Sequence, residues 1–197
     1  MIDFKETNRN LKNNVSMANI RETSTKLYLV RPSFIFYEGE FDDCIYSIYK
    51  EVSDKFNVPI SSVYITGSAH LGFSLKDEHD FSSNSDLDIA IIDSGLFNKI
   101  FSKILDESQE YQNRTIFRST DDLKRYQKNI CRGKIHPLYF PIGETKKDWD
   151  KFFSNISKTY SDFFTKITGC VYLSEECFRL YQENSLNRFV ITKGVTT

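Results

Sequence analysis

The chain of 197 residues contains little glycine and little proline, with 8 and 4 residues respectively. This composition excludes a collagen-like or low-complexity chain. The sequence also lacks an apolar leader and any run of about 18 apolar residues, so we expect no membrane-spanning segment. Neither sign of charge is in excess, because 26 basic residues stand against 27 acidic ones. This balance argues against a strongly basic nucleic-acid binder and leaves only a local basic patch open.

Cysteine is also sparse, and the four residues form no CxxC pair. The three histidines are not at zinc-finger spacing from them. Unpaired thiols are typical of a reducing compartment, so we expect a cytoplasmic protein with free cysteines.

Aromatic residues, in contrast, are abundant, with 17 Phe and 11 Tyr in a chain that is 40% hydrophobic. Such a chain can bury a core of ordinary domain size. Periodicity predicts helices near residues 41–56, 69–75, 95–109, 120–132, 148–164 and 174–188. It predicts strands at 61–66, 86–92, 115–117 and 134–140, and two extended pieces within 26–37. Pro137 restricts the last strand to an edge or a bulge.

These elements predict an α/β (α+β) fold, with a small mixed sheet flanked by helices. We expect three parts: an N-terminal arm at 1–38, a core at 39–145, and a helical C-terminal part at 146–197 packed on the core. The sequence does not decide whether the arm is an ordered element or a loose leader, or whether it mediates assembly.

Two aspartates open the apolar run Asp86 to Ile92 (DLDIAII). Residues two apart on a strand point to the same face, so the carboxylates of Asp86 and Asp88 are expected side by side. Adjacent carboxylates repel each other unless a cation lies between them and a ligand. Magnesium binds one or two carboxylates together with phosphate oxygens and water. The pair therefore predicts an Mg²⁺ or Mn²⁺ site, although acids at a strand entrance are also common without a metal.

A Gly-Ser turn follows the strand expected at 61–66. Such a turn before a helix leaves backbone N–H groups free at the positive helix end, where an anion binds. Gly67 would allow close approach of a phosphate, and the Ser68 hydroxyl would donate to it. Taken alone, Ser68 also fits an ordinary helix cap.

The two features in this order resemble the signature of the DNA polymerase beta-like nucleotidyltransferase superfamily. The resemblance rests on Thr66-Gly67-Ser68 followed by Ser85-Asp86-Leu87-Asp88-Ile89, and it extends over about residues 41–92. It implies a nucleotidyltransferase core in which Asp86 and Asp88 hold Mg²⁺ or Mn²⁺, while Gly67, Ser68 and Ser85 bind a nucleoside triphosphate. Members of this superfamily act in bacterial defence and toxin–antitoxin systems, among other settings.

Two departures from the family pattern concern the loop and the third acid. The segment between Ser68 and Asp86 is longer than usual, with a charged stretch from Lys76 to Ser83 that reads as a solvated loop. Active members also carry a third carboxylate on a later strand, which completes a two-metal site. The expected place, 134–140, has no Asp or Glu and contains His136, which is either a base or a structural side chain.

Two functions therefore stay open. The first is an enzyme that transfers a nucleoside monophosphate to a hydroxyl on a protein, RNA or small molecule, with Asp86, Asp88 and His136 as catalytic residues. The second is a catalytically degenerate binding or regulatory subunit with a protein partner. A basic stretch near residues 124–134 either grips phosphate groups or is a solvated helix face. The nucleotide, the acceptor and the oligomeric state are not encoded in any pattern we recognise.

Overall fold

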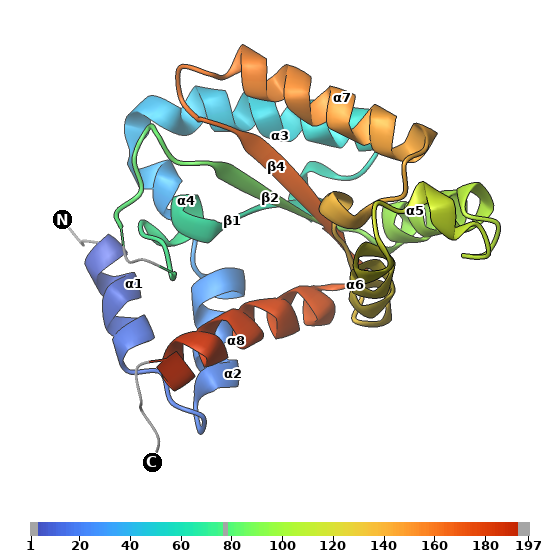
Figure 1. Cartoon of the computed structure of the whole chain (residues 1–197). Helices are drawn as coiled ribbons and strands as arrows, with labels where there is room; N and C mark the ends of the chain where they lie inside the picture. Colours follow the sequence, from blue (N-terminus) through green and yellow to red (C-terminus); the bar gives the residue numbers. More distant parts are fainter. Residues whose placement is uncertain (1–3, 77–78, 193–197) are drawn as a thin grey trace.

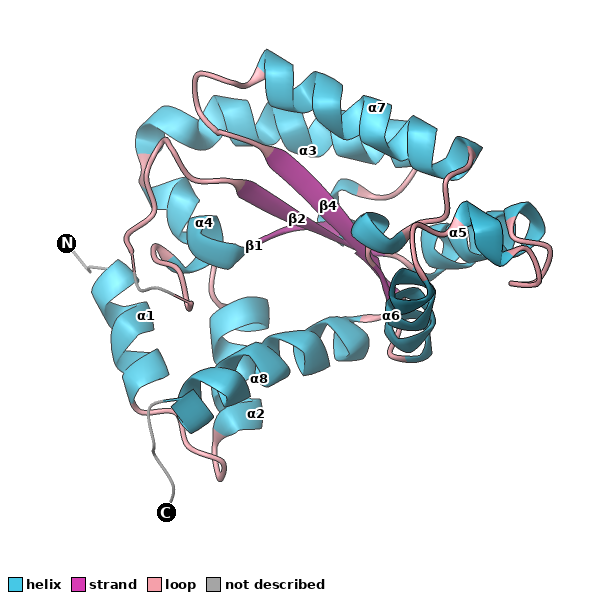
Figure 2. Cartoon of the chain, in the orientation of Figure 1, coloured by secondary structure: helices cyan, strands magenta, loops and turns pink. Residues whose placement is uncertain are grey.

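The computed structural model describes residues 4–76 and 79–192. It shows a mixed α/β fold in which helices lie on both faces of a small sheet (Figures 1 and 2). Within these residues, no helix is both long enough and apolar enough to cross a bilayer.

The sheet has four strands in the order β1-β2-β4-β3. β1 (Val63–Thr66) runs antiparallel to β2 (Leu87–Ile92), and β2 runs parallel to β4 (Ile167–Tyr172). The short β3 (Lys134–Ile135) pairs with β4 in the antiparallel direction and forms one edge. The predicted strand at 86–92 is therefore central, and the predicted edge position of the proline-bearing segment is confirmed.

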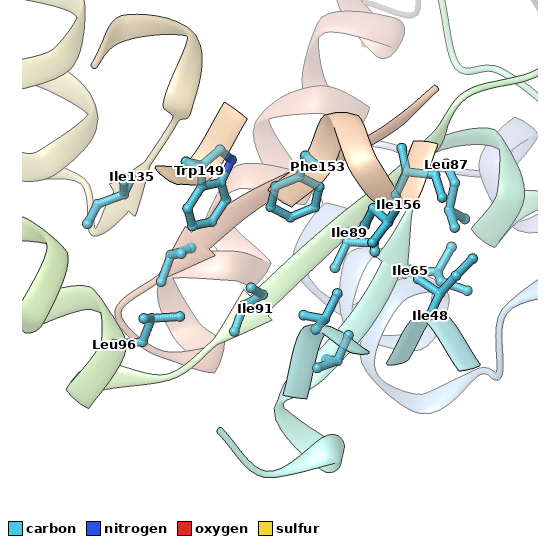
Figure 3. Close-up of a cluster of buried hydrophobic side chains, with 14 of the residues drawn as sticks. Ile48, Ile65, Leu87, Ile89, Ile91, Leu96, Ile135, Trp149, Phe153 and Ile156 are labelled. Carbon is cyan, nitrogen blue, oxygen red and sulfur yellow. The ribbon is translucent and has the colours of Figure 1, made fainter. Parts of the chain in front are cut away.

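One face of the sheet is covered by α3 (Asp42–Phe56) and α7 (Glu144–Thr159), with α5 (Ser94–Glu107) at one end (Figure 1). From β2, Leu87, Ile89 and Ile91 point into this core and are almost fully buried. Figure 3 shows them together with Ile48 of α3 and Phe153 of α7. Helical periodicity in α3 and α7 and alternation in β2 thus supply one continuous hydrophobic core.

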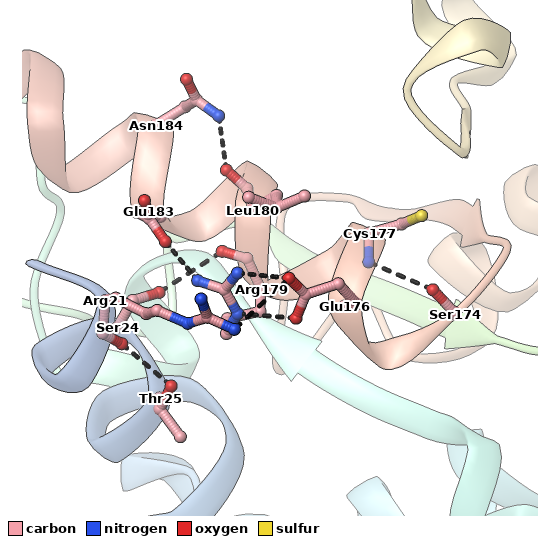
Figure 4. Close-up of polar contacts among 10 residues, drawn as sticks. All are labelled: Arg21, Ser24, Thr25, Ser174, Glu176, Cys177, Arg179, Leu180, Glu183 and Asn184. Carbon is pink, nitrogen blue, oxygen red and sulfur yellow. Dashed lines mark hydrogen bonds and ion pairs between the residues drawn. The ribbon is translucent and has the colours of Figure 1, made fainter.

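The opposite face of the sheet packs against α8 (Glu175–Thr192), which lies beside α2 (Ile20–Thr25). The guanidinium of Arg179 is buried and binds Glu176 and Glu183 on its own helix, and its backbone oxygen accepts a hydrogen bond from Ser24 of α2 (Figure 4). The N-terminal arm and α8 are therefore joined into one layer beneath the sheet.

The arm is ordered over its described residues and packs on the core. α1 (Phe4–Asn13) places Lys5 and Arg9 in ion pairs with Asp80 of the 79–85 loop. Asn8 donates to the backbone oxygen of Leu71 in α4 (Gly67–Leu71). Asp80, which we expected in a solvated loop, is exposed but paired, whereas Asp77 and Glu78 lie outside the described residues.

Several predicted elements are confirmed. The predicted helices at 41–56, 95–109 and 120–132 correspond to α3, α5 and α6 (Thr120–Cys131). The helix predicted at 148–164 begins earlier, as α7, and the last predicted helix is α8. All four cysteines are free, as expected.

The extended pieces predicted within 26–37 were wrong, because this segment forms helical turns. A π-helical turn spans Lys26–Val30 and a 3-10 turn spans Phe34–Tyr37. The buried positions run at helical spacing from α2 onwards, in the series Ile20, Thr23, Ser24, Leu27, Tyr28. Two of these five are polar, so the buried face of the helix does not show as a pattern of hydrophobic residues. The β-branched and aromatic residues in this segment instead favoured the prediction of strands.

The strand predicted at 115–117 was also wrong, since Arg114–Ile116 is a 3-10 turn. The strand predicted at 134–140 is confirmed only for Lys134 and Ile135. Pro137 has no backbone N–H to continue the ladder, and Pro137–Tyr139 turns away as a 3-10 helix.

The largest omission is β4, because no element was predicted between residues 165 and 173. This strand pairs with β2 over its whole length, so the C-terminal part expected to be helical supplies an inner strand of the sheet. β4 therefore belongs to the same sheet as β1, β2 and β3.

Candidate functional site

Asp88 lies on the α8 side of β2, at the point where three strands meet. Its register partners are Thr66 on β1 and Thr168 on β4. The carboxylate is half-buried, and its Oδ1 accepts a hydrogen bond of 2.7 Å from the Thr168 hydroxyl. Leu87 and Ile89 point to the opposite face, as the alternation predicted. One carboxylate oxygen is thus held by Thr168, while the other faces the turn after β1.

That turn is formed by Gly67, whose φ is +67°. A β-carbon at Gly67 would lie 2.8 Å from Oδ2 of Asp88, closer than carbon and oxygen ordinarily approach. Glycine is therefore required here both for the left-handed backbone and for the close approach of the carboxylate. β1 and β2 are neighbouring strands, so the Gly67 turn and Asp88 face each other in the structure.

A cavity of about 280 Å³, here called the Asp88 cavity, opens beside this contact. One side of the cavity is formed by Thr66 at the end of β1, Gly67 at the start of α4, and Asp88 on β2. The other side is formed by Lys134, His136 and Thr168. Side chains of α8 contribute the remaining wall, with Tyr181, Gln182 and Ser185. The volume lies just below the range for small-molecule sites, which is about 300–1,000 Å³.

Lys134 brings a positive charge into the Asp88 cavity. Its ammonium lies 4.7 Å from the ring centroid of Tyr181 and 5.3 Å from that of Tyr172. The Tyr181 hydroxyl donates to Asn129 at 2.7 Å, which fixes the ring. Cation–π contacts of this kind stabilise a lysine that has lost part of its hydration. The basic stretch at 124–134 is therefore divided, because Lys134 lines the cavity whereas Lys124 and Lys128 are exposed on α6.

His136 also reaches the cavity, at the position where β3 ends. Burial, with a smaller contribution from the Lys134 ammonium, lowers the pKa of His136 to about 4. Nδ1 accepts a hydrogen bond from the backbone N–H of Leu138, so the neutral ring carries its proton on Nε2. A neutral imidazole in this tautomer donates a hydrogen bond at Nε2 and is a weak base at pH 7. The geometry favours a donor role over the general-base role that we considered from the sequence.

β4, which pairs with β2 next to Asp88, has no carboxylate on the face that lines the cavity. β4 presents Thr168 and Cys170 there, while Ile167 and Val171 face the opposite core. Burial raises the pKa of the Cys170 thiol, the Asp88 carboxylate acts in the same direction, and Lys134 opposes both. The segment 134–140, where a third carboxylate was expected, is not the strand beside β2; that strand is β4, which offers a hydroxyl and a thiol.

Three predicted site residues do not line the Asp88 cavity. Asp86 is exposed immediately before β2, and Ser68 is half-buried in the first turn of α4. The Ser85 hydroxyl accepts from the backbone N–H of Ser82, and its backbone oxygen accepts from Thr165. Ser85 thus ties the loop before β2 to the segment before β4. The structure brings Gly67, Asp88 and His136 together and leaves the other three on the surrounding surface.

The donor set for a metal ion is small. Across residues 4–76 and 79–192, no three His, Cys, Asp or Glu side chains converge at metal-binding distance. An all-protein zinc or calcium cage therefore does not fit these residues. A magnesium ion bound mainly through phosphate oxygens and water needs only one or two carboxylates, and Asp88 is the carboxylate that lines the cavity.

Sequence reasoning missed the part of the cavity contributed by β4 and α8. The signal for β4 was weak, since Ile167-Thr168-Gly169-Cys170-Val171-Tyr172 contains three β-branched residues but no strict alternation of apolar and polar residues. Gly169 obscured it, because glycine is depleted in strands. No comparable signal marked Tyr181, Gln182 and Ser185, which α8 brings to the cavity by tertiary packing alone.

Comparison with known proteins adds no relative. No family model matches the chain, and searches of curated proteins and of solved structures found no match either.

Proposed function

We propose that the chain binds a magnesium nucleoside triphosphate at the Asp88 cavity and transfers the nucleoside monophosphate to a hydroxyl acceptor. The observation that carries the proposal is the contact between the Gly67 turn and Oδ2 of Asp88. It pairs a backbone suited to phosphate with a carboxylate suited to the counter-ion, on neighbouring strands. Gly67 and Asp88 also belong to the two sequence motifs on which the resemblance rests, Thr66-Gly67-Ser68 and Asp86-Leu87-Asp88.

In this proposal, Asp88 and Asp86 hold the ion, and the first-turn amides of α4 bind phosphate oxygens. α4 is five residues long, so these amides act as local donors and the helix dipole adds little. The ion, when bound, neutralises the triphosphate and polarises the reacting phosphorus. Lys134 adds positive charge from the opposite wall, and His136 donates from Nε2.

The reaction forms one phosphorus–oxygen bond and breaks another. The acceptor oxygen attacks the α-phosphorus, the bond from that phosphorus to the bridging oxygen breaks, and pyrophosphate leaves. The acceptor proton passes to solvent. Thr168 keeps Asp88 oriented through its 2.7 Å hydrogen bond, so that Oδ2 faces the Gly67 turn.

A second function, nucleotide binding without turnover, is favoured by the cavity face of β4. Thr168 occupies the position opposite Asp88, where a further carboxylate would complete a two-metal site. A binding or regulatory subunit would keep Asp88 and lack transfer.

Calorimetry with ATP, GTP, CTP and UTP in Mg²⁺ tests binding, and α-labelled triphosphates with Mg²⁺ or Mn²⁺ test transfer. Asp88→Asn keeps an acceptor for Thr168 and removes the charge, so we expect at least about tenfold weaker metal-dependent binding. Asp162→Asn, at an exposed carboxylate without an ion pair in the described chain, is the matched control. Equal binding by Asp88→Asn and the wild type would refute the proposed site. Binding without transfer would select the second function.

A further inference from the structure

A second and larger cavity, of about 550 Å³, adjoins the Asp88 cavity. We call it the lateral pocket. It lies between α7 and the turn after β3, and it shares two wall residues, His136 and Thr168, with the Asp88 cavity. β3 stops at Ile135, so no strand covers Ile167–Gly169 of β4, and this stretch lines the pocket. The pocket therefore lies at the open edge of β4, next to the candidate site, where β3 ends before Pro137.

The charge of the lateral pocket is predominantly positive. Its walls carry Arg118, Lys146 and Lys166 against one acid, Asp150. Asp150 is paired with Lys146 at 2.7 Å. Arg118 and Lys166 are exposed and make no ion pair within the described part of the chain. Two uncompensated cations at a concave surface attract an anion.

Another large cavity provides a comparison. It is about 490 Å³ and lies between α3, α5 and α7, where its three lysines face four acids. Its residues do not include His136, Thr168 or Asp88. The excess of positive charge thus distinguishes the lateral pocket from this other cavity. Of the two, the lateral pocket is the one that adjoins the candidate site.

The lateral pocket also has an apolar wall. Leu138, which is 53% exposed, stands at the rim, and Trp149 and Phe153 from α7 reach the inner side with 5% and 6% of their surface exposed. An anion with a flat apolar part would use both the cations and this wall. A guanidinium such as that of Arg118 binds phosphate with two parallel hydrogen bonds, and aromatic or apolar side chains contact nucleobases.

We infer that the lateral pocket binds the acceptor of the proposed transfer, and that this acceptor is a ribonucleotide, either free or at the end of an RNA. Its phosphate lies between Arg118 and Lys166, its base lies against the wall formed by Leu138, Trp149 and Phe153, and its ribose hydroxyls point toward His136. The acceptor role depends on the proposed function, whereas ribonucleotide binding can be measured without it.

Trp149 is the sole tryptophan of the chain and lines the lateral pocket, so its fluorescence reports binding directly. The probes are adenosine 5′-monophosphate and the trinucleotide pApApA, titrated without metal or triphosphate. We expect saturable changes in emission that weaken as salt rises, because phosphate contacts release counter-ions. The probe that binds more tightly identifies the source, a free nucleotide or an RNA end.

The test variant is Arg118→Ala/Lys166→Ala, for which we expect at least tenfold weaker binding of the better probe. The matched control is Lys99→Ala/Lys103→Ala, which removes two cations from the other cavity that Trp149 also lines. Both pairs are exposed, so thermal melting should show the fold intact. Equal loss in both variants, or no loss in the test variant, overturns the inference. Tighter binding of a glutamate-rich peptide than of either nucleotide probe also overturns it.

Asp88→Asn separates this inference from the proposed function. The variant should keep adenosine monophosphate binding while losing metal-dependent triphosphate binding. Wild-type protein that binds the monophosphate through Arg118 and Lys166 but no triphosphate would remove the acceptor role and keep the ribonucleotide site. Transfer that proceeds equally in Arg118→Ala/Lys166→Ala would keep the proposed function and overturn the lateral pocket as the acceptor site.

Discussion

The placement of β4 next to Asp88 can be tested through Gly169. A β-carbon there would lie 2.3 Å from Cζ of Phe153 and 2.8 Å from its Cε1. Carbon atoms pack at about 3.5–4.0 Å, so the ring would have to retreat by about 1 Å. Phe153 is 6% exposed and stacks on Trp149 at 4.9 Å, so a retreat of the ring disturbs this stacking. Gly169→Ala therefore overpacks the core above the sheet.

Overpacking of this kind lowers the free energy of unfolding by about 1–3 kcal/mol. Alanine also reduces the conformational freedom of the unfolded chain, which raises the free energy of unfolding by about 0.4–1 kcal/mol. We expect Gly169→Ala to lower the free energy of unfolding by about 1–2 kcal/mol. At about 2–4 °C per kcal/mol for a chain of this size, the melting temperature should fall by roughly 2–8 °C. Urea unfolding followed by circular dichroism measures the free energy, and calorimetry measures the melting temperature.

Two further variants give the test its specificity. Gly39→Ala is the control, because a β-carbon at Gly39 meets no atom within 4 Å, and its stability should be unchanged or slightly higher. Phe153→Leu removes the ring edge, so Gly169→Ala should cost less in that background, with a coupling energy of at least about 0.5 kcal/mol. Additive effects of the two substitutions would show that Gly169 does not lie under Phe153. The register that sets Thr168 opposite Asp88 would then be wrong.

Three other predictions concern the candidate site and the arm. Gly67→Ala should destabilise the protein by about 1–2 kcal/mol, because its φ of +67° is unfavourable for alanine and Oδ2 of Asp88 lies in the way; unchanged urea unfolding would contradict this. Thr168→Val should cost about 1 kcal/mol in the same assay and Thr168→Ser much less, since only the serine keeps the hydroxyl that binds Asp88; equal costs would show that the hydrogen bond is unimportant. Burial lowers the pKa of His70 to about 4, below its ordinary value near 6.5, so the unfolded chain binds the extra proton and stability should fall as pH decreases from about 6.5 to 4. His70→Gln should flatten that part of the melting-temperature profile, and an unchanged slope would assign it to other groups.

Local sequence patterns predicted the elements whose buried face consists of apolar residues. α3 has apolar residues at helical spacing, and β2 is a largely apolar run bounded by polar residues. The predicted bounds of both elements therefore agree with the structure to within one or two residues. The pairing of β1 with β2, which brings Gly67 to Asp88, agrees with the tendency of consecutive strands to lie together in a small sheet. These features depend on residues close in sequence.

The rest of the molecule depends on contacts between distant segments. α2 and the turn after it bury Thr23 and Ser24, which are polar and carry no hydrophobic signal. Lys134 belongs by sequence to a basic stretch that continues from α6, yet pairing with β4 turns it into the Asp88 cavity. The wall made by Tyr181 exists because α8 packs back on the sheet, and no local rule contains that information.

The proposed transfer and simple binding differ in whether a second carboxylate is needed beside Asp88, and position 168 is where one can be introduced. Thr168→Asp would place a carboxylate opposite Asp88 on a neighbouring parallel strand. Without metal, two like charges at this distance should lower stability, and the lost hydrogen bond adds to the cost. With Mg²⁺ or Mn²⁺, the ion should restore stability as its concentration exceeds the dissociation constant, so the melting temperature should rise with metal far more than in the wild type. Thr168→Asn, which is similar in size but uncharged, controls for the change of shape. A metal-independent melting temperature in Thr168→Asp would mean that Asp88 and residue 168 cannot share an ion, and the two-metal version of the proposed chemistry would then be excluded for this sheet.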